Sequence, residues 1–141
     1  MKPFFVAVIL LLGPALLPGP ARSDEKPKED VVFHAAIDKD GVQRVKMVGG
    51  SYFFKPNHVI VKVNVPVEFS IRKESGIVPH DIVLKAPEAG IDFTLSLEED
   101  PQTVRFTPTK TGSYPFYCDK KFLFFPSHRK EGMEGTLEVI P

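Results

Sequence analysis

The chain has 141 residues, with 18 basic and 18 acidic side chains, so its formal net charge is zero at neutral pH. This balance gives no argument for binding nucleic acid or a charged membrane surface. The chain contains a single cysteine, which excludes an internal disulfide, and 14 prolines and 10 glycines interrupt it at short intervals.

The first 23 residues are predicted to be a secretory signal peptide. Lys2 provides a short positive region, residues 4–12 form an apolar run, and the Ala-Arg-Ser sequence at 21–23 fits the small-x-small cleavage pattern. The apolar run is shorter than the about 20 residues that a membrane-spanning helix needs. We therefore expect cleavage near Ser23 and a periplasmic or secreted mature protein without a transmembrane segment.

The mature chain is predicted to be a short leader followed by one domain. Residues 24–30 are all charged apart from one proline, which is typical of a flexible segment. Residues 31–141 have the size of a single domain. Loss of Lys2 and Arg22 leaves 16 basic residues (18 − 2) against 18 acidic ones, a net charge of −2. We expect no nucleic-acid partner.

The domain is predicted to be all β. Residues 58–65 show the clearest alternation, because valine occupies positions 59, 61, 63 and 65, and this pattern indicates a strand with one buried face. No window shows a sustained helical period. Residues 85–97 are predicted to be mainly loop and Gly49-Gly50 a turn. The remaining strands are predicted at 31–37, 42–48, 51–54, 67–71, 77–84, 103–107, 113–118 and 135–140. Short strands at this spacing favour a β-sandwich or barrel with Greek-key connections.

The lone cysteine, Cys118, is the residue that most needs an explanation, because an exported free thiol oxidises unless it is buried or bound to metal. It follows an aromatic segment, Tyr-Pro-Phe-Tyr at 114–117, and precedes His128 and Met133. His80 lies upstream in a strand-like segment. One thiolate, two imidazoles and one thioether are the ligands of a trigonal His₂Cys copper site with a weak axial methionine. One loop between two strands can deliver three of these four residues to one point.

This C-terminal region resembles that of the cupredoxins, the blue-copper family of plastocyanin and azurin. Tyr-x-Phe-Tyr-Cys at 114–118 is similar to the strand that carries the copper thiolate in that family, and Gly-Met-x-Gly at 132–135 is similar to its axial-ligand region. The resemblance covers about residues 53–140 and implies a cupredoxin-like Greek-key β-sandwich. It implies one copper ion, Cu(I) or Cu(II), held by the four residues His80, Cys118, His128 and Met133, with Met133 as the axial ligand.

The chain departs from the family pattern in two places. Nine residues, 119–127, separate Cys118 from His128, an interval longer than in the small blue-copper proteins and similar to that in the type 1 copper domain of copper nitrite reductases. Asp81 follows His80, where the family carries an asparagine that helps brace the cysteine-bearing segment. An ionised carboxylate there would favour oxidised copper. Both departures bear on the reduction potential and the spectral type.

Other residues compete for positions in the proposed site. Glu131 and Glu134 flank Met133 closely and offer oxygen ligands in place of its thioether. His34 and His58 are alternatives to the upstream histidine ligand, and both are interpreted as solvent-side residues of their strands.

The segment between the cysteine and the second histidine contains four consecutive apolar residues, Phe122–Phe125, with basic residues on either side. One interpretation packs these side chains into the core. The other leaves some of them exposed near the copper ligands, where they form a docking surface for a redox partner, as exposed apolar patches often do.

The sequence favours a secreted or periplasmic copper protein that transfers single electrons, and not an enzyme. Hydrolase and phosphate-loop motifs are absent from it. Nucleophilic catalysis by Cys118 would leave the aromatic strand and Met133 unexplained. The alternative is a copper-binding protein for resistance, storage or delivery without a redox partner, and a third interpretation is a metal-free interaction module. The sequence has no Met-rich or His-rich tract of the kind that delivery proteins often add, which favours electron transfer.

Overall fold

The computed structural model describes residues 29–141, so the predicted signal peptide and most of the predicted leader lie outside the described residues. Within this range the chain forms ten strands and one short 3₁₀ helix, η1 (Pro87–Ala89). No helix in the same range has the length and apolar character needed to cross a membrane. The strands are β1 (Val32–His34), β2 (Gln43–Gly50), β3 (Phe53–Lys55), β4 (His58–Lys62), β5 (Val67–Lys73), β6 (Asp81–Ala86), β7 (Ile91–Ser96), β8 (Gln102–Phe106), β9 (Gly112–Tyr117) and β10 (Glu134–Ile140).

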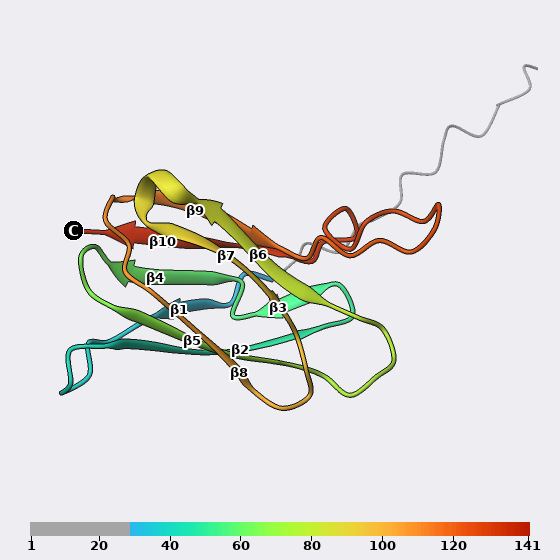
Figure 1. Ribbon diagram of the computed structural model, residues 1–141, viewed down its shortest axis with the longest axis horizontal. Helices are drawn as coiled ribbons and strands as arrows, with labels where there is room; N and C mark the ends of the chain where they lie inside the picture. Colours follow the sequence, from blue (N-terminus) through green and yellow to red (C-terminus); the bar gives the residue numbers. More distant parts are fainter. Residues whose placement is uncertain (1–28) are drawn as a thin grey trace, which may run out of the picture.

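The strands form two mixed sheets that face each other as a sandwich (Figure 1). The six-stranded sheet has the order β1-β4-β10-β9-β6-β7, and the four-stranded sheet has the order β3-β2-β5-β8. Strand β4 runs parallel to both β1 and β10, and β2 runs parallel to β5, whereas β9 is antiparallel to both of its neighbours. The all-β sandwich predicted from the sequence is confirmed.

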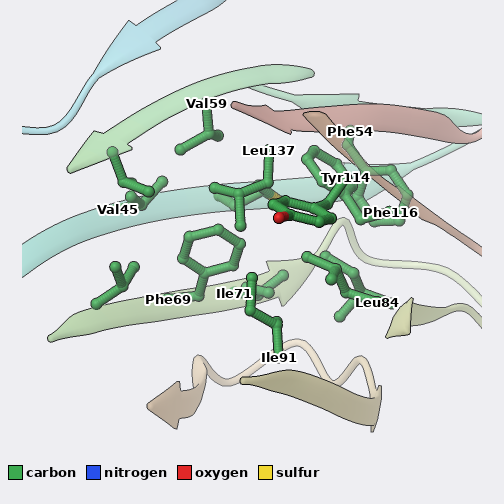
Figure 2. Packing of buried hydrophobic residues seen from close by; sticks show 14 of the residues in the cluster. Val45, Phe54, Val59, Phe69, Ile71, Leu84, Ile91, Tyr114, Phe116 and Leu137 are labelled. Carbon is green, nitrogen blue, oxygen red and sulfur yellow. The ribbon is translucent and has the colours of Figure 1, made fainter. Parts of the chain in front are cut away.

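The core lies between the two sheets and is built from the alternating inward positions of their strands (Figure 2). Val45 on β2 and Phe69 on β5 come from the four-stranded sheet, and Phe116 on β9 and Leu137 on β10 come from the other sheet; all four are fully buried. Burying each such side chain stabilises the fold by roughly 1.5–3 kcal/mol. The inward face of β9 also carries Tyr114, so the aromatic segment before the cysteine is part of this core.

The predicted turn at Gly49-Gly50 was wrong, because β2 continues through both glycines and pairs them with Phe54 and Phe53 of β3. The absence of side chains at these glycines allows close packing. A Cβ on Gly49 would lie 2.7 Å from Cδ1 of Leu97, and one on Gly50 would lie 2.7 Å from the ring of Phe53. The chain turns one residue later, at positions 51–52.

The predicted loop at 85–97 was also wrong in part. Strand β7 occupies its second half and pairs with β6 along its whole length. Its inward residues Ile91, Phe93 and Leu95 alternate with polar ones, a pattern hidden by the nearby Pro87 and Gly90.

Several predicted strands are shorter in the structure than in the sequence pattern. The strand expected at 31–37 is reduced to Val32–His34. The strand expected at 77–84 begins only at Asp81, because Ile77 is fully exposed and Val78 half-exposed in the preceding loop. The strand expected at 58–65 ends at Lys62, since Asn64 turns the chain with a φ of 60°.

Gly135 on β10 gives a test of how tightly the site end of the sandwich is packed. A Cβ at this position would lie 2.4 Å from the carbonyl oxygen of Asn57 and 2.4 Å from the ring of Phe116. Alanine normally suits a strand better than glycine. Here we expect Gly135→Ala to lower the free energy of unfolding of the metal-free protein by about 1–3 kcal/mol, measured by urea denaturation. The control Ser113→Ala, at an exposed position of β9, should stay within ~0.5 kcal/mol of the wild type. An equal effect of the two variants would contradict the packing argument.

Candidate metal centre

Three of the four residues predicted to hold a metal lie at the ends of neighbouring strands, and the fourth, His128, lies in the segment between β9 and β10. His80 immediately precedes β6, Cys118 immediately follows β9, and Met133 immediately precedes β10. Because β9 is antiparallel to both β6 and β10, these three ends meet at the same end of the sheet. The segment that connects β9 to β10 projects there, opposite the C-terminus (Figure 1).

The structure brings His80, Cys118 and His128 together in a buried cluster. Their ligand atoms all lie within 4.8 Å of one another. The two Nδ1 atoms of the histidines are 3.2 Å apart, and Nδ1 of His128 lies 3.5 Å from Sγ of Cys118. Cys118 is fully buried, and each histidine is only 6% exposed. Cys118 and His128 follow His80 by 38 and 48 positions in the sequence, yet the fold brings all three together.

Met133, the fourth predicted ligand, is fully buried and held against this cluster by its backbone. Its carbonyl accepts the N–H of Cys118 at 3.0 Å, and its own N–H donates to the carbonyl of His128 at 2.9 Å. The absence of a side chain at Gly49 leaves space for it, because a Cβ on that glycine would lie 3.2 Å from Cε of Met133. Met133 therefore belongs to the same packed unit as the thiol and the second histidine.

The competing residues are placed differently. Glu131 and Glu134 are exposed, whereas the methionine between them is buried. His34 is exposed on β1, and Nε2 of the half-buried His58 lies 2.9 Å from a carboxylate oxygen of Glu138. Among residues 29–141, the only group of three or more histidine, cysteine or acidic side chains with metal-binding spacing is the His80–Cys118–His128 cluster.

Asp81 braces the cysteine segment, as the family asparagine is expected to do. Its backbone N–H points at Sγ of Cys118, 3.5 Å away, and its carboxylate accepts the N–H of Asp119 at 2.7 Å. The carboxylate is also 3.6 Å from the ammonium group of Lys120. The sequence suggested the role of Asp81 but gave no sign of Lys120 as its partner, because 39 positions separate them and only the folded chain brings them together.

Tyr52 is a second residue of the site that the sequence pattern did not indicate. It lies in the turn between β2 and β3 with a φ of 63°, and its ring meets that of His128 edge to face at 5.3 Å between centroids. This contact fixes the outer side of the histidine ring.

Burial shifts the Cys118 thiol and the His80 imidazole towards their neutral forms. It raises the pKa of the Cys118 thiol to about 11. It lowers the pKa of His80, and the nearby His128 and Lys73 lower it further. Near neutral pH the thiol is therefore protonated and the His80 imidazole is neutral, so a metal ion that binds here must displace the thiol proton.

The donor set fits a soft or borderline metal ion. Thiolate and imidazole ligands suit copper or zinc, whereas magnesium and calcium prefer oxygen. Metal–nitrogen and metal–sulfur bonds of about 2.0–2.3 Å allow one ion to bridge donor atoms up to roughly 4 Å apart. The 3.2 Å between the two Nδ1 atoms and the 3.5 Å between Nδ1 of His128 and Sγ of Cys118 meet this requirement.

The aromatic residues between Cys118 and His128 are exposed, so the interpretation that packs them into the core was wrong. Phe122, Leu123, Phe124 and Phe125 are 65%, 68%, 85% and 54% exposed. The N–H of His128 bonds to the carbonyl of Lys120, so a backbone hydrogen bond closes the loop that carries these residues. The rings of Phe124 and Phe125 stack on each other at 5.2 Å.

A groove of about 610 Å³ separates this loop from the loop before β6. Phe122 and Phe125 line one side, Ile77 and Val78 line the other, and His128 forms part of its wall. One metal-site residue thus reaches an apolar surface.

The class of protein follows from the sandwich and the site together: an all-β fold with a buried His₂Cys group at one end of the sheets. No protein-family model and no curated protein sequence matches the chain. Solved protein structures do match the chain. The metal-binding domain of the Streptococcus pneumoniae D39 Cu(I)-exporting P-type ATPase CopA has a TM-score of 0.60 at 15% identity, over 81% of this chain and all of that one.

Two further structures extend this comparison. A copper-binding protein solved by NMR in its apo form has a TM-score of 0.56 at 21% identity, over 77% of this chain and 96% of that one. Auracyanin A, a "blue" copper protein from Chloroflexus aurantiacus, has a TM-score of 0.51 at 18% identity, over 71% and 100%. The chain has the cupredoxin fold.

The raised pKa of Cys118 predicts a pH-dependent metal affinity. One proton leaves the thiol for each ion bound as long as the pH is below about 11, whereas His80 is already neutral above pH 7 and releases none. We expect the apparent Cu(I) affinity to rise about tenfold per pH unit from about pH 7 to about pH 9, measured anaerobically against a chromophoric chelator. Cys118→Ser should lose this slope, and a flat profile in the wild type would argue against thiolate coordination.

Proposed function

We propose that this protein binds one copper ion through His80, Cys118 and His128, with Met133 as the axial ligand, and carries single electrons. The observation that supports this most is the buried convergence of two imidazoles and one thiol, with the methionine packed into the same unit. The names of the solved neighbours, which include a copper-binding protein and a "blue" copper protein, agree with copper as the metal.

Bound copper would supply the one-electron Cu(II)/Cu(I) couple. The protein's contribution is to hold the donors in place and keep water away. Backbone hydrogen bonds link Cys118 to Met133 and Met133 to His128, so three donors belong to one connected unit. The fourth, His80, is fixed because its carbonyl accepts the N–H of Leu97. Rigid donors change little between oxidation states, which keeps the barrier to electron transfer low.

Cys118 and His128 provide two routes out of the site. Cys118 continues into β9 and the core of the sandwich, whereas His128 reaches the groove beside the Phe122–Phe125 loop. The shorter route to solvent passes through His128.

The redox partner in this proposal is a protein that docks on the Phe122–Phe125 loop. Large exposed apolar patches on protein surfaces usually mark interaction sites. Here the surface lies directly beside a metal-site histidine, which shortens the distance an electron must travel. Lys121 and Lys130 are exposed on the same loop and give it basic character.

A second candidate function is copper storage or delivery without a redox partner. It is favoured by the similarity to the metal-binding domain of a Cu(I)-exporting ATPase. The two functions share one site and differ in whether the protein survives repeated oxidation and reduction with its copper in place.

Both functions are proposed for a protein exported to the periplasm or secreted. The support is the positive residue, short apolar run and small-residue cleavage pattern in residues 1–23. An electron carrier of this kind is proposed to act without catalysing a reaction of its own.

Copper loading tests the site and the function together. We expect Cu(II) to give an intense visible thiolate-to-copper charge-transfer band in the mature protein. Cys118→Ser should abolish the band, because it removes the thiolate. His34→Ala and His58→Ala are the matched controls and should retain it. A wild-type protein without such a band would rule out the site, while loss of copper on reduction would favour delivery over electron transfer.

Electron self-exchange tests the docking surface without knowledge of the partner. Two copies that exchange an electron must bring their copper sites close together, and the surface beside His128 offers the shortest approach. We expect Phe124→Asp to leave the absorption band unchanged but to slow self-exchange about tenfold or more, as NMR line broadening would show, because an apolar contact between two copies would have to bury a carboxylate. The control Ile37→Asp changes a half-exposed residue that pairs with Gln43, at the far end of β2. Equal slowing by both variants would count against this surface.

A further inference from the structure

We infer that Lys120 is a positioning residue, which joins the three ligand-bearing segments and balances the charge of Asp81 beside the metal. This inference rests on the proposed copper function. The sequence presented Lys120 only as part of a basic flank of the apolar loop. In the folded chain its backbone carbonyl and its ammonium group contact different parts of the site.

The backbone of Lys120 holds the second histidine, since its carbonyl accepts the N–H of His128 at 2.9 Å. The side chain points to the first ligand segment, and its ammonium group lies 3.6 Å from Oδ2 of Asp81. Asp81 in turn directs its N–H at Sγ of Cys118 and its other oxygen, Oδ1, to the N–H of Asp119. One lysine and one aspartate therefore connect the segments that carry His80, Cys118 and His128.

The burial of this pair makes its charge balance important. The Asp81 side chain is only 7% exposed, whereas that of Lys120 is 39% exposed. A nearly buried carboxylate without a positive partner is unfavourable. It would also place a full negative charge next to a thiolate, which stabilises Cu(II) over Cu(I). Lys120 supplies a positive charge from the solvent side. The Asp81 carboxylate can therefore brace the cysteine segment without adding a net negative charge to the site.

This arrangement gives opposite predictions for its two members. Lys120→Met leaves the carboxylate unbalanced and should lower the reduction potential. Asp81→Asn keeps an Oδ1 acceptor for Asp119 but removes the negative charge, so it should raise the potential. The double variant restores neutrality and should return close to the wild type. We expect each single change to alter the Cu(I)-to-Cu(II) ratio at a fixed potential about tenfold, which corresponds to ~59 mV for one electron.

Spectroelectrochemical titration of the copper-loaded variants measures these potentials. Lys120→Arg should retain the wild-type potential because it restores the charge. Lys121→Met is the matched control, since it removes the same charge from an exposed neighbour, and should have a much smaller effect. A purely structural lesion would move both single variants in the same direction. Shifts of equal sign, or equal effects of Lys120→Met and Lys121→Met, would overturn the inference.

A measurement on the metal-free protein tests the positioning role even if the copper proposal fails. The N–H groups of Asp119 and His128 are the donors held by this network. We expect Lys120→Met to speed their hydrogen exchange about two- to fivefold, as loss of a partly exposed ion pair predicts, while Lys121→Met leaves both unchanged. Unchanged exchange in Lys120→Met would reject the positioning role. Absence of the charge-transfer band in the wild type would instead reject the copper proposal.

Discussion

The site depends on the antiparallel pairing of β9 with both β6 and β10. This pairing fixes three strand ends at one point, so the residue after β9 faces the residues before β6 and β10. Those residues are Cys118, His80 and Met133. The aromatic core side chains Tyr114 and Phe116 anchor β9 in the sandwich, and the position of the thiol follows from their burial. Three of the four predicted ligands are thus positioned by strands of one sheet, and only His128 depends on the loop between β9 and β10.

The segment between Cys118 and His128 combines opposite properties. Its two ends are tied into the site, because Cys118 bonds to Met133 and His128 to Lys120 through the backbone. Its middle, Phe122–Phe125, lies in solvent. Exposing four bulky apolar side chains is unfavourable for an isolated molecule, since burial of each would stabilise by roughly 1.5–3 kcal/mol. The proposed docking role would account for apolar residues at a place where the fold does not use them.

The protonation states of Cys118 and His80 follow from their burial. The same burial raises the pKa of Cys118 and lowers that of His80, so without a bound ion both groups are neutral near pH 7. A bound ion therefore replaces a proton at the sulfur. Asp81 is a buried acidic residue beside these groups. Its ion pair with Lys120 and its hydrogen bond from the N–H of Asp119 show how a carboxylate is accommodated there.

The sequence by itself determined the class of fold and the inward faces of most strands, and it singled out His80, Cys118, His128 and Met133 as candidate donors. Alternation and turn residues are local properties that a single sequence displays. The ligand chemistry of a lone cysteine with nearby histidine and methionine can also be recognised from the residue types alone. Local patterns failed where contacts between distant residues matter. Gly49 lies in a strand at a place where Leu97 and Met133 leave little room for a Cβ, and Phe122–Phe125 lie outside the core in a loop that a backbone hydrogen bond from His128 to Lys120 closes. The contacts of Lys120 with Asp81 and of Tyr52 with His128 were decided only by the tertiary structure, since no pattern in a single sequence encodes the meeting of residues that the sheets bring together.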